Sequence, residues 1–417
     1  MEIKRDLYLK RLVDRMHNGM IKVVTGVRRC GKSYLLFKLF YDYLRQNGVK
    51  DNHIIRLALD DRMNKQYRDP DALCNFVRKQ IKDEQQYYVL LDEVQFVPEF
   101  EDVLNSFLHI HNIDTYVTGS NAKFLSKDVI TEFRGRGDEI HIYPLSFKEY
   151  MQVYTGDKIT GLDEYMTYGG LPNIVSLKSE EQRINYLKNL FEETYIKDIK
   201  ERYGVRHDDD LSETINIIAS SIGGLINPLK IANTFKSVKQ ASISPITIKS
   251  YLDYLCDSFL VEKAIRYDVK GRKYIDTPFK CYFADCGLRN ARLNFRQIEQ
   301  THLMENVIFN ELKMRGYNVD VGTVIKRTVN SEGNRVQSQL EIDFVCNQGS
   351  KRYYIQSAYR LGSEEKERQE RASLINVDDS FKKIIIVGIP SIVHHDNDGI
   401  TIISIYDFLL NENSLEL

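Results

Sequence analysis

The 417-residue chain has little net charge and no long hydrophobic run. Its 58 lysines and arginines nearly balance its 59 aspartates and glutamates, which gives a formal net charge of −1. This balance excludes a simple polycation, so any contact with nucleic acid must come from local basic patches. The longest apolar stretches, such as Ile384 to Val387, are far too short to span a bilayer. Because the charged N-terminal residues also lack the apolar core of a secretory signal, we expect a soluble cytoplasmic protein.

Cysteine is also scarce and dispersed. The six cysteines are scattered along the chain, which argues against a disulfide framework in a chain of this length. Cys281 and Cys286 lie close together, but no second pair of cysteines or histidines follows at the spacing of a zinc site. Charged residues make up 28% of the chain and hydrophobic residues 42%, which is ordinary globular composition. The length predicts two to three domains.

The clearest motif is at residues 26–33, which read GVRRCGKS: Gly, four residues, then Gly-Lys-Ser. It lies between an apolar run at 21–24, predicted as a strand, and residues 34–40, predicted as a helix. Glycines let the backbone N–H groups of such a loop surround phosphates, and the helix N-terminus adds its positive end. We expect Lys32 to reach the β- and γ-phosphates of a nucleotide and Ser33 to bind Mg²⁺. The expected nucleotide contacts are Gly26, Val27, Arg28, Arg29, Cys30, Gly31, Lys32, Ser33, Tyr34 and, from a later segment, Asn121.

A second motif completes the pattern of an ATPase. The apolar run at 87–91 reads as a strand covered on both faces and ends in Asp92 and Glu93. Asp92 can hold Mg²⁺ through water, and Glu93 can polarise the attacking water. An acidic pair after a strand is often an ordinary loop, but the phosphate-binding loop earlier in the chain favours the catalytic interpretation. Because no Asn-Lys-x-Asp element follows, ATP is favoured over GTP, and Glu93 favours hydrolysis over a kinase reaction.

Two further segments admit two interpretations each. After a predicted strand at 115–118, Ser120 and Asn121 could sense the γ-phosphate, as in ATPases with an extra strand between the two motif strands, or they could cap a helix. Arg134 and Arg136 could be arginine fingers, in cis or across the subunit boundary of a homo-oligomer, or they could form a solvated basic turn.

The set GVRRCGKS, YYVLLDEVQ, TGSN, FRGRG and IYPLSFKEY, with YGGLP at 168–172 and YIKDI at 195–199, resembles a widespread prokaryotic group of AAA-type ATPases. The resemblance covers nearly the whole chain, and its ATP-site motifs are more specific than its C-terminal ones. It implies an α/β fold with a P-loop NTPase parallel sheet and a helical lid, a winged-helix domain, and a C-terminal restriction-endonuclease-like (PD-(D/E)XK-like) domain of unknown function. It also implies ATP and Mg²⁺ as ligands and hydrolysis of ATP to ADP and phosphate. The expected domains are an ATPase core at 1–155, a helical lid at 156–206, a winged helix-turn-helix at 207–292 and a nuclease-like domain at 293–417.

The third of these domains is a candidate reader of nucleic acid. Three predicted helices, the last opened by Ser244 and Pro245, precede a hairpin with a basic tip. The last helix could enter a major groove while the hairpin grips phosphate, or the same fold could contact protein or pack against the ATPase. The obvious polar readers are few, which favours binding of the backbone over sequence-specific readout. These readers are Thr247, Lys249 and Ser250, and the basic tip consists of Lys270, Arg272 and Lys273.

The C-terminal domain resembles a nuclease with a damaged site. A predicted helix carries Glu305, and a predicted strand carries Asp343. A nuclease centre of this class also needs a lysine beside its metal-binding carboxylates. The third motif should read acidic-x-Lys, but it reads Gln356, Ser357, Ala358. We therefore predict a vestigial site at Glu305, Asp343 and Gln356, and a domain that binds a nucleic-acid end, a partner or its own ATPase.

Three hypotheses follow for the whole chain. The first is an ATP-hydrolysing AAA-type protein associated with nucleic acid. The second is an ATP-gated switch or scaffold with slow hydrolysis, which has no need of nucleic acid. The third is an active ATP-dependent nuclease, which the missing lysine makes the least favoured.

Overall fold

The computed structural model describes the chain except for residues 1, 120–134, 240–241, 330–332 and 362–363. Contacts divide it into two compact units, which are described separately below. The first comprises Met1–Pro144, Leu171–Asn173 and Asp257–Phe259, and the second comprises Leu145–Gly170, Ile174–Cys256 and Leu260–Leu417. None of the described helices has the length and apolar character needed to cross a membrane.

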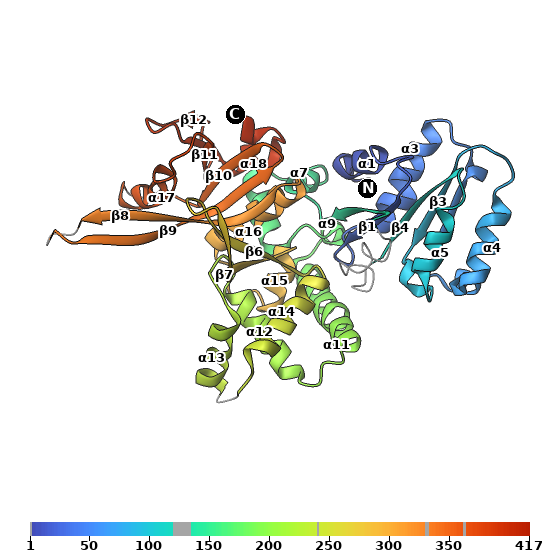
Figure 1. Cartoon of the computed structure of the whole chain (residues 1–417), viewed down its shortest axis with the longest axis horizontal. Coiled ribbons are helices and arrows are strands. Elements are labelled where there is room, and N and C mark those ends of the chain that lie inside the picture. The colour runs from blue at the N-terminus through green and yellow to red at the C-terminus, as the bar shows by residue number, and fades with distance from the viewer. Residues whose placement is uncertain (1, 120–134, 240–241, 330–332, 362–363) are drawn as a thin grey trace. The chain divides into compact units, whose positions relative to one another are not determined.

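The first unit is built on a five-stranded parallel sheet (Figure 1). Its strand order is β2-β3-β4-β1-β5. β4 pairs in parallel with β1 on one side and with β3 on the other, which confirms the predicted extra strand between the two motif strands. Because all strands run the same way, the residues that follow β1, β3 and β4 meet at one edge of the sheet. The strands are β1 (Ile21–Gly26), β2 (Ile54–Ala58), β3 (Tyr87–Asp92), β4 (Ile113–Thr118) and β5 (Gly137–Ile142).

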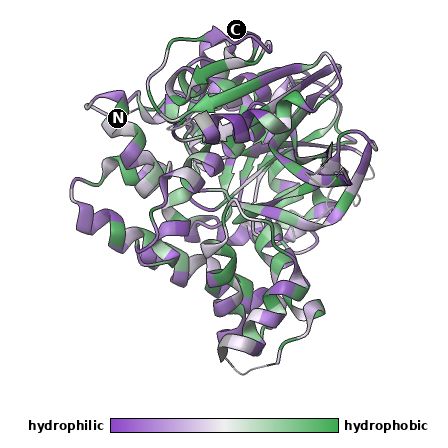
Figure 2. Ribbon diagram, turned by 90° about the vertical axis from the view of Figure 1, so that its left-hand side faces the viewer, coloured by the Kyte–Doolittle hydropathy of each residue, from purple (hydrophilic) through white to green (hydrophobic). Residues whose placement is uncertain are grey.

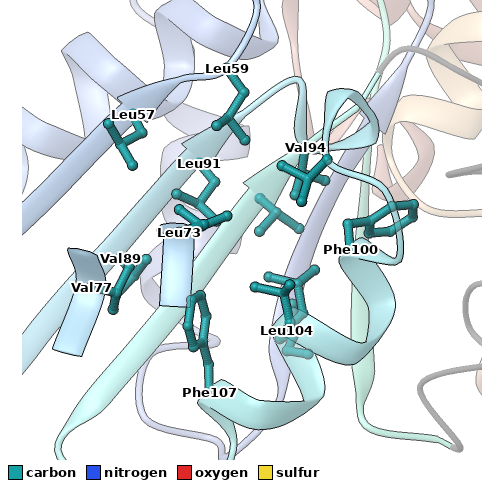
Figure 3. Packing of buried hydrophobic residues seen from close by; sticks show 14 of the residues in the cluster. Leu57, Leu59, Leu73, Val77, Val89, Leu91, Val94, Phe100, Leu104 and Phe107 are labelled. Carbon is teal, nitrogen blue, oxygen red and sulfur yellow. The ribbon is translucent and has the colours of Figure 1, made fainter. Parts of the chain in front are cut away.

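Helices cover this sheet and bury its apolar residues. All six residues of β3 are buried, as predicted from its continuous apolar run. Leucines, valines and phenylalanines of α4 and α5 pack on β3 in one hydrophobic cluster (Figure 3). The helical segments of this unit are α1 (Asp6–Val13), α2 (Lys32–Tyr34), the π-helical η1 (Leu35–Phe40), α3 (Tyr41–Gln46), η2 (Asp51–His53), η3 (Arg62–Arg68), α4 (Pro70–Gln80), η4 (Val94–Phe96) and α5 (Phe100–Phe107).

Most of the remaining helices belong to the second unit. One of them, α14 (Pro245–Asp257), begins where the sequence predicts, because the side chain of Ser244 accepts a hydrogen bond from the N–H of Thr247 at 3.0 Å. Hydrophilic and hydrophobic residues alternate along the helices, as expected for helices with one buried side (Figure 2). The helices after β5 are α7 (Phe147–Tyr150), α8 (Lys158–Tyr168), α9 (Pro172–Ser176), α10 (Glu180–Leu190), η6 (Phe191–Ile196), α11 (Lys197–Tyr203), α12 (Asp208–Ser220), α13 (Pro228–Lys239), α14 (Pro245–Asp257), α15 (Cys286–Arg292), α16 (Gln300–Met314), α17 (Glu364–Ile375), α18 (Ile405–Leu410) and η7 (Ser414–Glu416).

The second unit also contains an eight-stranded mixed sheet of order β12-β13-β11-β10-β9-β8-β6-β7 (Figure 1). The hairpin expected to be a wing, β6 and β7, lies at one edge of this sheet, because β6 pairs in parallel with β8. Its tip is also engaged, since Lys270 forms an ion pair of 2.8 Å with Asp378. The predicted hairpin is therefore part of this sheet, and its role as a wing that binds nucleic acid stays a prediction. The strands are β6 (Val261–Asp268), β7 (Lys273–Phe283), β8 (Asn318–Val329), β9 (Arg335–Gln348), β10 (Lys351–Ala358), β11 (Lys382–Val387), β12 (His394–His395) and β13 (Thr401–Ser404).

Candidate nucleotide site and a second polar cluster

The phosphate-binding loop follows β1 and leads into α2. Gly26 has φ +139°, and a Cβ there would lie 2.2 Å from the carbonyl oxygen of Ile142, so only glycine fits. Gly31 has φ +102° and caps the N-terminus of α2. The buried Lys32 ammonium donates hydrogen bonds to the carbonyl oxygens of Gly26 at 2.9 Å and Val27 at 3.1 Å. These contacts hold the lysine over the loop that the sequence predicts to surround phosphate.

The other predicted nucleotide contacts differ in exposure. Val27 and Cys30 are buried, and Arg28 is half-buried. Arg29, Ser33 and Tyr34 are exposed. The loop therefore has an inward side that packs on the unit and an outward side that is accessible to a ligand.

Arg5 supports this loop, and the sequence reasoning missed it. The guanidinium of this buried residue donates to the carbonyl oxygens of Cys30 at 2.9 Å and Tyr143 at 2.8 Å. It also lies 4.6 Å from the centre of the Tyr8 ring. The arginine thus ties the loop to the segment after β5. Cys30 and Tyr143 are far from Arg5 in sequence, so no local pattern could have indicated these two contacts.

The acidic pair lies beside the loop. Asp92 is buried at the end of β3, and the hydroxyl of Thr118 at the end of β4 donates to its carboxylate. Burial raises the pKa of Asp92, while hydrogen bonds from Thr118 and Ser33 oppose the rise. The serine of the loop therefore acts on the same carboxylate as Thr118 and favours its ionised form. The structure brings the two predicted motifs together at the edge of the sheet.

Glu93 is held at this edge by its neighbours. Its N–H donates to the Thr118 hydroxyl at 3.0 Å, and the Gln95 side-chain amide donates to its carboxylate. Its φ of +54° is uncommon for a residue other than glycine and costs on the order of 1 kcal/mol. The backbone at Glu93 is therefore kept in a strained conformation next to Asp92.

Three of the predicted residues lie outside the described part of the chain: Ser120, Asn121 and Arg134. Arg136 is exposed, and its carbonyl oxygen accepts a hydrogen bond from the N–H of Ile21 at 2.9 Å. The sensor and the arginine fingers stay predictions. Within the described ranges, no group of three or more His, Cys, Asp or Glu side chains is arranged to hold a metal ion.

The second unit contains a buried lysine among the carboxylates of the predicted nuclease-like site. The Lys280 ammonium lies 2.8 Å from Glu305, 2.7 Å from Glu341 and 3.2 Å from Asp343, measured to one carboxylate oxygen of each. It comes from β7, a strand that the sequence assigned to a wing. The motif position of the lysine is Ala358, but Lys280 from another strand supplies a positive charge among these carboxylates. The vestigial nuclease site stays a prediction.

Gln356 does not contact the Lys280 ammonium. Its side-chain N–H donates a hydrogen bond to the carboxylate of Glu370 in α17 at 2.9 Å. Its side-chain oxygen accepts a hydrogen bond from the backbone N–H of Asp343 at 3.4 Å. The Asp343 carboxylate accepts a further hydrogen bond from the N–H of Ser357 at 2.9 Å. Of the three predicted members, Glu305 and Asp343 share the lysine, while Gln356 links the backbone of Asp343 to α17.

The cluster predicts a pH dependence of stability. Burial raises the pKa of Glu305 from 4.5 to about 7, against the lowering effect of Lys280. Between these pH values the unfolded chain loses a proton that the folded protein keeps, so this group makes the free energy of unfolding fall as pH rises from about 4.5 to 7. Glu305→Gln should flatten the decline in urea denaturation across that range. The exposed Glu365→Gln is the control, and an unchanged slope in Glu305→Gln would refute the assignment.

Comparison with known proteins agrees with the geometry of the first unit. Residues 18–151, which include both motifs, match the family described as "AAA domain", and residues 159–299 match a "Domain of unknown function (DUF8612)". A Haemophilus influenzae protein is 34% identical over 414 residues, 98% of either chain. A Methanocaldococcus jannaschii protein is 26% identical over 386 residues, 89% of this chain and 80% of its own. Both relatives are described as uncharacterised. The Walker-type ATPase of Pyrococcus abyssi aligns over 70% of this chain and 96% of its own, with 15% identity and a TM-score of 0.48.

Proposed function

We infer that this chain binds ATP with Mg²⁺ and hydrolyses the ATP to ADP and phosphate. The chain belongs to the same family as the Haemophilus influenzae protein, and it contains an AAA domain. One observation carries this proposal: the Thr118 hydroxyl donates a hydrogen bond to Asp92, and Ser33 of the loop lowers the pKa of the same carboxylate. A phosphate-binding loop and a metal-binding carboxylate are thereby adjacent, as phosphoryl transfer requires.

Each residue has a role that its surroundings support. Lys32 would exchange the carbonyl oxygens of Gly26 and Val27 for charged phosphate oxygens, which form stronger hydrogen bonds. Ser33 and Asp92 supply hydroxyl and carboxylate oxygens, the donors that Mg²⁺ prefers. Bound Mg²⁺ would neutralise phosphate charge and favour the ionised form of Asp92, whose pKa burial raises.

The residues that act on water and on developing charge are proposed as follows. Glu93, fixed by Thr118 and Gln95, would orient the attacking water. Asn121 would sense the γ-phosphate. Arg134 and Arg136 would neutralise the charge that develops on the transferred phosphoryl group, within the chain or across a subunit boundary.

Lys32→Ala tests the nucleotide site directly. Removal of a charged hydrogen-bond donor to phosphate costs about 1.5–3 kcal/mol, so ATP affinity should fall about 10- to 150-fold. Calorimetric titration with a non-hydrolysable ATP analogue and Mg²⁺ measures the change. Lys38→Ala is the matched control, because Lys38 lies six residues further along the same helical segment and pairs with Asp42 on the surface. Unchanged affinity in Lys32→Ala would contradict the proposed site.

Association with nucleic acid is a second part of the proposal. In α14, Lys249 is exposed, and Thr247 and Ser250 are half-buried. Arg272 and Lys273, at the tip between β6 and β7, are exposed as well. These groups can contact a phosphate backbone. Lys270, at the same hairpin tip, would have to give up its ion pair with Asp378 in order to bind phosphate as well. The alternative, an ATP-gated switch or scaffold, needs none of them to touch nucleic acid.

A further inference from the structure

We propose that the hairpin of β8 and β9 is an arm that binds the phosphate backbone of nucleic acid through Arg327 and Arg335. This inference rests on the proposed nucleic-acid association and assigns it to a surface that is separate from α14 and from the β6–β7 tip. The segments that carry the argument are residues 324–329 and 335–340, which are called the arm below.

The arm extends beyond the sheet as a two-stranded ribbon (Figure 1). The described pairing of β8 with β6 covers Val321 to Thr323, and the pairing of β9 with β10 starts at Phe344. Beyond these points the two strands pair with each other, from Val324 opposite Leu340 to Val329 opposite Arg335. A two-stranded ribbon is at best marginally stable alone, so the arm gains from a binding partner.

One face of the arm collects hydrogen-bond donors. Arg327 is directly opposite Gln337, and the alternation of side chains along β9 places Arg335 and Gln339 on the same face as Gln337. All four residues are exposed. Side chains opposite or diagonal across a strand pair lie within about 8 Å of each other. One stretch of backbone phosphates can therefore contact both arginines.

The charge of the arm points to an anionic partner. The sequence of segment 324–340 contains three basic residues, Lys326, Arg327 and Arg335, and one acidic residue, Glu332. Its formal charge is therefore 3 − 1 = +2, whereas the whole chain carries −1. Further along the same face of β9 comes Glu341, and its carboxylate is paired with Lys280 at 2.7 Å. Basic residues therefore outnumber acidic residues in this segment.

The chemistry favours nucleic acid over a second copy of the chain. Two arms of equal positive charge repel each other, whereas guanidinium groups match the geometry of phosphate. Segment 324–340 contains no Phe, Tyr or Trp, so it offers no aromatic ring on which unpaired bases could stack. The arm therefore suits the backbone of a duplex, with the glutamine amides as additional donors.

Arg327→Gln combined with Arg335→Gln tests this inference on the full-length protein. Fluorescence anisotropy with a labelled DNA duplex, repeated over a series of salt concentrations, gives the affinity and its salt dependence. Each lost phosphate contact lowers the slope of log K against log salt by about 0.9, so the double variant should lose about 2 units of slope. Its affinity at low salt should fall at least about tenfold.

The control variant combines Arg62→Gln with Arg368→Gln, which changes the net charge equally at two exposed positions off the arm. It should bind as the wild type does. If the wild type binds no duplex or single strand even at low salt, the nucleic-acid association fails and the arm inference with it. If the wild type binds and the arm variant matches it in affinity and slope, the arm inference alone fails. A change in oligomeric state of the arm variant, seen by light scattering, would show that the arm joins copies of the chain and would also overturn the inference.

Discussion

Glu93→Gln is expected to reduce ATP hydrolysis about 10²- to 10⁴-fold, the usual contribution of a group that takes a proton in catalysis. The amide keeps the size of the side chain but cannot accept the proton of an attacking water. Glu93 follows Asp92 at the carboxyl edge of the sheet, and its backbone is held by Thr118. ATP binding should persist, because Lys32, Ser33 and Asp92 are untouched.

Phosphate release from ATP and binding of a labelled ATP analogue should be measured on the same preparation. Glu99→Gln is the matched control: it makes the same chemical change at an exposed glutamate a few residues along the chain. A native rate in Glu93→Gln would show that another group activates the water. Weak hydrolysis in the wild type itself, with tight ATP binding, would favour the switch or scaffold.

Lys280→Met should lower the free energy of unfolding by about 3–5 kcal/mol, because it leaves buried carboxylates without their positive charge. Burial disfavours the charged amine, but Tyr282 and the carboxylates of Glu305, Asp343 and Glu341 outweigh burial and raise the pKa of Lys280 well above its usual value. Lys280 is therefore charged in the folded protein. Its replacement by methionine removes the positive charge that compensates the carboxylates, in addition to changing the packing.

Urea denaturation at neutral pH measures this effect. Lys263→Met is the control, because Lys263 forms a single ion pair of 2.6 Å with the half-exposed Asp253, and such pairs contribute about 0–1 kcal/mol. Equal losses in Lys280→Met and Lys263→Met would contradict the assigned role of the cluster.

Most of the five-stranded sheet and its loop could be predicted from the sequence. The GVRRCGKS loop, the apolar strand before Asp92 and the extra strand at 115–118 are local patterns, and the pairing of β4 between β1 and β3 confirms the order that they imply. Strand β5, with its polar and charged residues, was missed, as were the short β12 and β13. Their apolar runs are too short or too interrupted to produce a clear period.

The supporting contacts depended on the three-dimensional fold. Arg5 reaches Cys30 and Tyr143, and Lys280 reaches Glu305, Glu341 and Asp343, over separations at which no spacing rule operates. Motifs and periodicity report how neighbouring residues are arranged along a strand, loop or helix. A buried guanidinium or ammonium is instead stabilised by whichever carbonyl and carboxylate oxygens the packing brings within hydrogen-bonding distance. The phosphate-binding loop and the acidic pair could therefore be predicted from the sequence. The positions of Arg5 and Lys280, whose charges stabilise the two polar sites, are decided by how the strands assemble in the folded protein.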